Sequence, residues 1–164
     1  MRYLKEPIAR RANREDECTG RFWEGRFKSI ALLDDAAIQN CMAYVDLNPY
    51  RAHLADGPEH ADYTSVRRRI IQSDDRLAPV EQVGIELTDY VALLNWTIAV
   101  DRGDRTDIPA TLEAQLSTLG QTPLQWLGGV RAHRLKYRAY GLQRSLDAYC
   151  RKLRQRWIRR PSIA

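Results

Sequence analysis

The residues of this chain best equipped for chemistry are arginines, and they gather near its C-terminal end. Residues 131–160 hold eleven basic side chains and a single acid, Asp147, which gives this segment a net charge of +10 within a chain of net charge +5. Four of the chain's 26 basic residues are lysines, so the chemistry is that of guanidinium, whose planar fork holds a phosphate through two hydrogen bonds. Such a segment attracts a polyanion, with nucleic acid as the first candidate and an anionic membrane surface as the second.

The histidines and cysteines do not show the spacing of a metal or disulfide site. The sequence has three of each, and it contains no H-x-H, H-E-x-x-H or C-x-x-C motif. It also lacks a P-loop, a G-x-G-x-x-G motif and a nucleophile elbow. Most common enzyme classes thereby lose support, and structural or surface roles explain the histidines better.

The elements that would position functional residues are mostly helical, with one strand near the N-terminal end. Residues 3–13 have the periodicity of a helix, and their arginines lie toward its C-terminal end, where cations interact favourably with the helix dipole. Residues 21–32 are rich in aromatic side chains and alternate in character, which favours a strand of a half-buried sheet. A lone strand is not stable, and no other segment shows a convincing strand pattern.

A second helix is predicted from Ala36 to about Asn48, with a capping aspartate before it and Pro49 after it. Its larger apolar side chains recur at helical spacing and predict its buried stripe: Ile38, Cys41, Met42 and Val45. At roughly 100° per residue, Tyr44 and Asn48 lie one above the other, about a quarter turn from the centre of that stripe. These two side chains are therefore expected to flank the core.

The remainder of the chain predicts a helical second half. After a short helix at 66–71, a polar stretch that ends at Pro79 is typical of a connector. We place a domain boundary there, with domains at 1–78 and 79–164. The second domain is predicted to end in a helix after Gly141, with an apolar stripe on one face and arginines on the others.

Two motifs give the first half of the chain a resemblance to a known family. The first is G-R-F-W-E-G-R-F-K-S at residues 20–29, and the second is M-A-Y-V-D-L-N-P-Y-R-A at residues 42–52. Together they resemble the catalytic C-terminal part of the REP-associated tyrosine transposases, which belong to the HUH superfamily of single-tyrosine DNA transposases. The resemblance covers about residues 1–71, and residues 88–96 also resemble a helical extension that some members carry.

The resemblance implies an α+β remnant that is mainly α: one strand and the nucleophile helix of a ferredoxin-like domain, followed by a helical C-terminal extension. It implies that Tyr44 attacks a DNA phosphate to form a 5′-phosphotyrosine intermediate. It also implies that Asn48 stands where the family supplies an additional polar ligand to a divalent metal, Mg2+ or Mn2+, which a His-hydrophobe-His pair holds in the intact enzymes. Tyrosine ionises near pH 10, so its attack depends on that metal and on nearby cations.

Each of these roles has a structural alternative. Without the surrounding motif, Tyr44 is explained as a half-buried helix aromatic whose hydroxyl finds a partner, and Asn48 as a helix-ending residue. Trp23 and Phe27 are expected in the core. The predicted contacts to DNA are basic side chains of the motifs and of the C-terminal segment, with a solvated surface as the alternative: Arg21, Arg26, Lys28, Arg51, Arg134, Arg138, Arg151 and Arg154.

The chain departs from the family pattern because it has no H-x-H pair and no strands to pair with residues 21–32. Since the sequence begins at Met1, in or just before the first predicted helix, we expect a decayed or split transposase, or a start codon assigned too far downstream. The expected function is that of a truncated transposase that binds single-stranded or hairpin DNA. Alone, it is expected to bind no metal and to cleave little or no DNA.

The expected partners are DNA and either a complementing N-terminal half or a second copy of the chain. The alternative is a small helical nucleic-acid-binding or interaction module without catalysis. The mean hydropathy is −0.53, and the sequence has neither an apolar run long enough to cross a bilayer nor a secretory signal. We therefore expect a cytoplasmic protein with no membrane partner.

Overall fold

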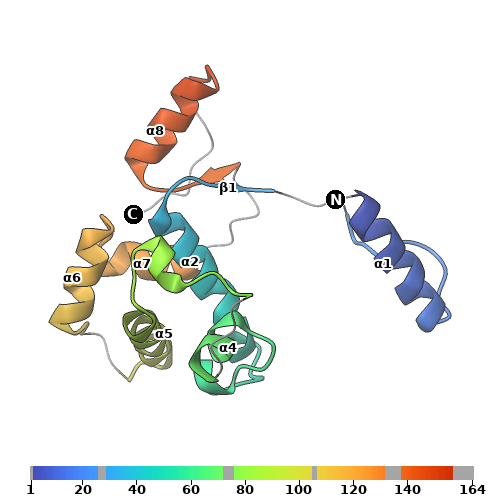
Figure 1. Cartoon of the computed structure of the whole chain (residues 1–164), viewed down its shortest axis with the longest axis horizontal. Helices are drawn as coiled ribbons and strands as arrows, with labels where there is room; N and C mark the ends of the chain where they lie inside the picture. The colour runs from blue at the N-terminus through green and yellow to red at the C-terminus, as the bar shows by residue number, and fades with distance from the viewer. Residues whose placement is uncertain (1, 26–28, 72–75, 105–106, 132–137, 157–164) are drawn as a thin grey trace.

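The structure is a computed structural model that describes residues 2–25, 29–71, 76–104, 107–131 and 138–156. These residues form eight α-helices, two short 3-10 helices and two short strands, so the chain is mainly helical, as predicted (Figure 1). In chain order the elements are α1 (Arg2–Glu15), β1 (Ala31–Leu32), α2 (Asp35–Asp46), α3 (Asn48–Arg51), η1 (Pro58–His60), α4 (Ser65–Ile71), η2 (Val80–Val83), α5 (Leu87–Arg102), α6 (Ala110–Thr118), α7 (Pro123–Arg131), β2 (Ala139–Tyr140) and α8 (Gln143–Lys152).

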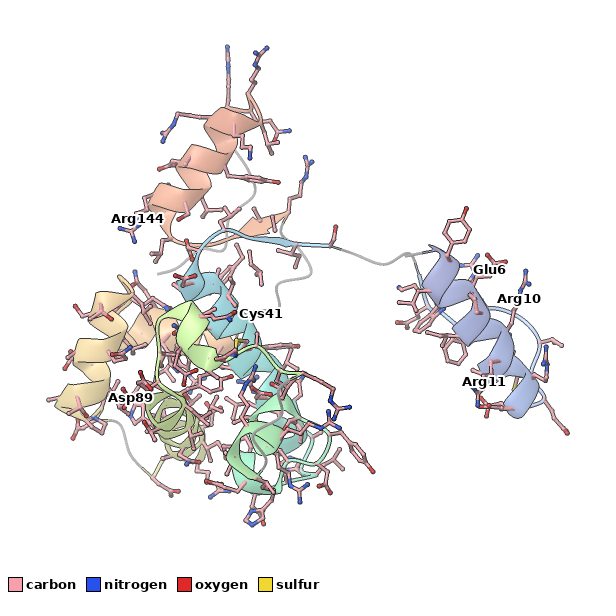
Figure 2. All side chains as sticks on the ribbon, in the orientation of Figure 1. Glu6, Arg10, Arg11, Cys41, Asp89 and Arg144 are labelled. Carbon is pink, nitrogen blue, oxygen red and sulfur yellow. The ribbon has the colours of Figure 1, made fainter. Side chains whose placement is uncertain are left out.

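Helix α1 lies apart from the other helices, and the segment that follows it folds back along it (Figure 1). The Trp23 indole donates to the Lys5 carbonyl at 3.1 Å, and the Lys5 ammonium lies 4.9 Å from the centre of the Trp23 ring. Two ion pairs lie on exposed parts of α1, each between residues one helical turn apart: Arg10 with Glu6, and Arg11 with Glu15 (Figure 2). Residues 21–25 are therefore an irregular segment that packs on α1, where the sequence predicted a strand.

The predicted strand is reduced to Ala31–Leu32, and its partner is β2. The two strands are parallel, with the Ala31 amide donating to the Arg138 carbonyl at 3.1 Å and the Leu33 amide donating to the Tyr140 carbonyl at 3.0 Å. A pair of two-residue strands has no alternation to read, which is why β2 escaped prediction. Trp23 is 37% exposed, so it is not a core residue, while Phe27 lies outside the described residues.

Asp34 fixes the beginning of α2. Its carboxylate accepts from the Ala37 amide at 2.9 Å, as a helix N-cap does, and from the Leu142 amide just before α8 at 2.8 Å. One side chain therefore caps α2 and ties α8 to the same end. At the other end, Pro49 does not stop the chain's helical course, because it occupies the first turn of α3, where its missing amide hydrogen is tolerated.

The buried face of α2 differs from the predicted stripe. Small and polar side chains are buried: Ala36, Ala37, Gln39, Asn40, Ala43 and Asp46. Of the predicted stripe, Val45 is 54% exposed, and Ile38, Cys41 and Met42 are half-buried (Cys41 is labelled in Figure 2). The helix thus turns its small residues toward α7, which packs closely against it, and leaves part of its apolar stripe uncovered.

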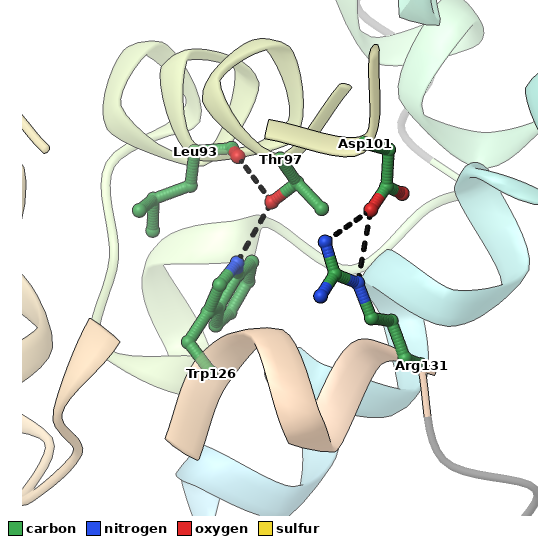
Figure 3. Close-up of polar contacts among 5 residues, drawn as sticks. All are labelled: Leu93, Thr97, Asp101, Trp126 and Arg131. Atoms are coloured by element: carbon green, nitrogen blue, oxygen red, sulfur yellow. Dashed lines mark hydrogen bonds and ion pairs between the residues drawn. The ribbon is translucent and has the colours of Figure 1, made fainter. Parts of the chain in front are cut away.

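The main core lies between α2, α5, α6 and α7 and includes Val66 of α4 and Val80 of η2. It therefore draws residues from both sides of position 78/79, although the domain boundary itself stays a prediction. The Trp126 indole, fully buried, donates to the Thr97 hydroxyl at 2.9 Å, and that hydroxyl donates to the Leu93 carbonyl at 2.7 Å (Figure 3). An ion pair between Arg131 and Asp101 joins the C-terminal ends of α7 and α5.

Gly129 of α7 packs tightly against the Asn40 side chain of α2. A Cβ built there would overlap the Asn40 amide and the Tyr140 hydroxyl, whereas a Cβ at the neighbouring Gly128 would meet nothing within 4 Å. We expect Gly129→Ala to lower the free energy of unfolding by about 1–3 kcal/mol through overpacking. Gly128→Ala, its matched control, should raise it by up to about 1 kcal/mol, because alanine favours the helix. Urea unfolding measures both, and equal effects would contradict this packing.

Candidate functional site

Tyr44 lies in the last part of α2, half-buried, with Arg51 beside it. The guanidinium carbon of Arg51 is 5.6 Å from the centre of the Tyr44 ring, within the range of a cation–π contact. Arg51 ends α3, one short helix further along the chain. The structure thus places a positive charge, on α3, next to Tyr44, the predicted nucleophile, on α2.

Asn48 is exposed and begins α3, one turn after Tyr44. Leu47, which separates the two helices, keeps a right-handed helical conformation with φ −89° and ψ −3°, so the chain advances through the junction without reversing. The Asn48 carbonyl accepts from the Ala52 amide at 2.9 Å, and its side chain is left to solvent. Tyr44, Asn48 and Arg51 therefore follow one another along a single helical path.

Asp46, between these residues, is a buried structural hub that the sequence reasoning missed. It is 1% exposed and accepts from the Tyr90 hydroxyl at 2.8 Å, the Ser65 hydroxyl at 3.0 Å and the Val66 amide at 3.4 Å. These donors belong to α5 and α4, so one carboxylate joins three helices beneath the Tyr44 segment. The only signal in the sequence was an acid next to the apolar side chains of Val45 and Leu47.

Tyr90 is buried at this hub, and its environment makes it hard to ionise. Burial and, to a lesser extent, the charge and hydrogen bond of Asp46 raise the pKa of Tyr90 far above its usual value. Tyr90 is therefore a neutral hydrogen-bond donor, and it is not suited to act as a nucleophile.

The raised pKa of Tyr90 predicts a loss of stability at high pH. Its contribution is fully present below about pH 10, the ordinary tyrosine pKa, and decreases above that pH because the unfolded chain releases a proton that the folded chain keeps. Between pH 9 and 11, the free energy of unfolding should fall more steeply in the parent chain than in Tyr90→Phe, by up to about 1.4 kcal/mol per pH unit. Urea titrations at several pH values measure this, with Tyr3→Phe, at a 94% exposed position, as the control. Equal slopes in all three proteins would contradict it.

The residues around Tyr44 do not by themselves make a metal site. Asn48 offers one neutral oxygen, whereas Mg2+ prefers six oxygen ligands in a near-octahedral arrangement. Within the described ranges, no group of three or more His, Cys, Asp or Glu side chains is placed to hold a metal ion. Asn48 alone does not fit the metal that the family resemblance implies, and we derive no step through it.

The predicted DNA contacts fall into separate regions. Arg51 lies beside Tyr44, while Arg21 is exposed on the segment that packs along α1. Arg138 is exposed just before β2, and Arg151 and Arg154 are exposed in and after α8. Arg26, Lys28 and Arg134 lie outside the described residues.

Helix α8 lies at the opposite end of α2 from Tyr44. Its start is tied to Asp34, ten residues before Tyr44, and an α-helix rises about 1.5 Å per residue. Ten residues of helix correspond to about 15 Å, so the start of α8 lies about that far from Tyr44 along α2. Figure 1 shows α8 beyond one end of α2. A single DNA strand would have to extend over a few nucleotides to contact both Tyr44 and the α8 arginines.

Comparison of the chain with protein-family models, with curated proteins and with solved structures finds no match in any of the three. The described helices include none that is both long enough and apolar enough to cross a membrane.

Proposed function

We propose that this chain is the C-terminal part of a single-tyrosine transposase of the REP-associated type, with a ferredoxin-like catalytic domain to which it contributes α1, β1 and α2. The observation that carries the proposal is the arrangement of Tyr44, Asn48 and Arg51 along α2 and α3, with the guanidinium 5.6 Å from the Tyr44 ring. The terminal nitrogens of Arg51 are buried, so the guanidinium would act on a phosphate at Tyr44 through its charge and not by direct contact, and that charge would stabilise the negative charge of the phosphoryl group.

The uncovered apolar side chains of α1 and α2 support the same proposal. Leu4 and Ile8 of α1 are 59% and 45% exposed, and Val45 of α2 is 54% exposed. An amphipathic helix normally buries its apolar stripe against another layer. Both helices would bury these faces if a sheet from another segment or polypeptide covered them, as a ferredoxin-like domain requires.

The proposed reaction is an exchange of phosphodiester bonds. The Tyr44 hydroxyl oxygen attacks the phosphorus of a single-stranded DNA, a tyrosyl-phosphate ester forms, and the bond from phosphorus to the 3′ oxygen breaks. The tyrosine gives up its proton, and the departing oxygen takes one up as a free 3′-hydroxyl, so the step needs no oxidant or energy-rich cosubstrate. A later attack by a 3′-hydroxyl reverses the step and joins new ends.

The experiment mixes the full chain with a separately expressed N-terminal half that carries a His-x-His pair, a labelled hairpin single strand and Mg2+ or Mn2+. The proposal predicts a covalent protein–DNA adduct that survives denaturing electrophoresis. If no adduct forms, but affinity for the hairpin persists and is lost when Arg151, Arg154 and Arg156 become alanine, the chain is instead a nucleic-acid-binding module without catalysis. The exposure of Arg151, Arg154 and Arg156 makes that second function chemically feasible.

A further inference from the structure

Tyr63 stands out because it is both fully exposed and held in an unfavourable backbone conformation. Its relative exposure is 105% and its φ is +63°, in the left-handed region that a bulky side chain rarely adopts. Such conformations cost of order 1–3 kcal/mol and persist where the surrounding structure enforces them, often at functional sites. Glu17, His53 and Arg154 are also exposed residues with a positive φ, so what distinguishes Tyr63 from them is its large, fully exposed aromatic ring.

The turn that carries Tyr63 is fixed on both sides. Thr64 is buried, donates from its hydroxyl to the Ala61 carbonyl at 2.7 Å and accepts from the Arg67 amide at 3.3 Å. Ser65, the next residue, donates to Asp46 at 3.0 Å and so connects the turn to the helix of Tyr44. The exposed Tyr63 side chain is thus carried by a hydrogen-bonded turn that is joined through Ser65 to Asp46 of α2.

Tyr63 lines two surface hollows. One, of about 330 Å³, is lined by Asp62, Tyr63, Thr64, Arg67, Arg68 and Ile71. The other, of about 310 Å³, is lined by Tyr63, Thr64, Ser65, Arg68 and Leu77. Each volume is near the lower end of the range for ligand sites, about 300–1,000 Å³, which suits a single heterocyclic ring better than a larger molecule.

The three consecutive arginines of α4 have different surroundings. Arg67 pairs with Asp62 at 2.8 Å and donates to the Glu59 carbonyl at 3.1 Å, and Arg69 donates to the Ala78 carbonyl at 3.0 Å. Arg68, between them, is exposed and lines both hollows. The Arg68 guanidinium therefore borders both hollows that Tyr63 lines.

We propose that Tyr63 is a stacking platform for unpaired bases of a single-stranded nucleic acid, one base in each hollow, and that Arg68 contacts the phosphate between them. An aromatic ring accepts any base on its face, and an adjacent cation supplies the backbone contact, which is how sequence-tolerant single-strand sites are built. The inference rests on the proposed function in so far as that function brings single-stranded DNA to the chain. It adds a site outside the Tyr44 motif.

The test uses the full chain and a fluorescein-labelled dT12 strand, with anisotropy as the measurement. Tyr63→Asn removes the ring but keeps the turn, because asparagine tolerates a left-handed conformation. It should weaken binding by about 5- to 100-fold, whereas Tyr63→Phe should bind like the parent chain. Arg68→Gln should weaken binding and lower the slope of log affinity against log salt by about 0.7. Leu124→Asn and Arg11→Gln, at exposed positions on other helices, are the matched controls.

An abasic strand of the same length isolates the stacking step. With this strand, Tyr63→Asn and the parent chain should bind equally, because the phosphates remain and the bases are gone. A U12 strand should behave like dT12, since the ring contacts base faces. The proposal is overturned if Tyr63→Asn binds dT12 as tightly as the parent chain, which would favour a protein partner for this surface, or if it weakens binding of the abasic strand equally.

These binding measurements need neither an N-terminal half nor a metal ion. A Tyr63-dependent affinity, together with no covalent adduct in the reconstituted mixture, would therefore support the stacking site and contradict the transposase proposal. An adduct formed at full yield by Tyr63→Asn, together with unchanged dT12 affinity, would do the reverse.

Discussion

Replacing Asp46 by alanine is expected to lower the free energy of unfolding by roughly 2–4 kcal/mol. The substitution leaves the Tyr90 hydroxyl, the Ser65 hydroxyl and the Val66 amide without their shared acceptor in a buried site. Each buried donor left without a partner costs about 1–3 kcal/mol. We expect the structure to relax partly around the three donors, so the total cost is below the sum of three full penalties. A typical domain is stable by about 5–15 kcal/mol, so this one change removes a large share of the total.

Urea unfolding followed by circular dichroism measures this loss. Asp56→Ala is the matched control, because Asp56 is exposed and accepts from the Arg102 guanidinium through its backbone carbonyl, which alanine keeps. It should change stability by less than about 0.5 kcal/mol. If Asp46→Ala were as mild as Asp56→Ala, the three-helix hub would not hold the Tyr44 segment in place.

The second large effect concerns catalysis: Tyr44→Phe should abolish the covalent adduct in the reconstituted mixture, a loss of at least about a thousandfold. Phenylalanine keeps the half-buried ring beside Arg51 and removes only the attacking oxygen, so the fold should be retained. Affinity for the hairpin strand should change little.

Tyr50→Phe is the matched control for this loss. Tyr50 is also half-buried and also has a guanidinium over its ring, with Arg102 at 5.4 Å. A general effect of removing a hydroxyl beside an arginine would appear in both variants, whereas a nucleophile is lost only in Tyr44→Phe. Equal adduct yields from the two variants would remove Tyr44 from the mechanism.

Much of the helical half could be predicted because its boundaries are encoded locally. Gly103 and Gly120 follow α5 and α6 in left-handed conformations, with φ of +79° and +72°, as helix-ending glycines do. Thr122 and Gln125 cap the start of α7 reciprocally, with the Gln125 side chain accepting from the Thr122 amide at 2.9 Å. Such signals depend on a few neighbouring residues and need no knowledge of the rest of the fold.

The packing of α2 could not be predicted, because its buried face is made of small and polar residues. A search for large apolar side chains selects the face with Val45, which is 54% exposed, while Ala43 and Asp46 are buried. Which face is buried depends on α7, whose Gly129 allows the close approach, and on donors that α4 and α5 bring to Asp46. These partners lie 19 or more residues from the α2 residues that they contact, beyond the reach of any local sequence pattern.

The candidate site shows the same division. The sequence predicted Tyr44 and Asn48 on one face of a helix and Arg51 as a contact to DNA, and the helical path through Leu47 places Arg51 beside Tyr44. It gave no indication of Tyr63, because exposure and a left-handed backbone are properties of the folded turn. The roles of all four residues in DNA binding or cleavage stay predictions.

The most direct test of the central claim is to locate the bond between protein and DNA. The adduct from the reconstituted mixture is digested with nuclease and protease, and the peptides are sequenced by tandem mass spectrometry. The account predicts a nucleotide attached through a phosphate to the Tyr44 oxygen. With a protease that cuts after arginine, the modified peptide would contain Asn48 and end at Arg51. A nucleotide on any other residue, or no modified peptide from this chain while the N-terminal half and metal are present, would contradict it.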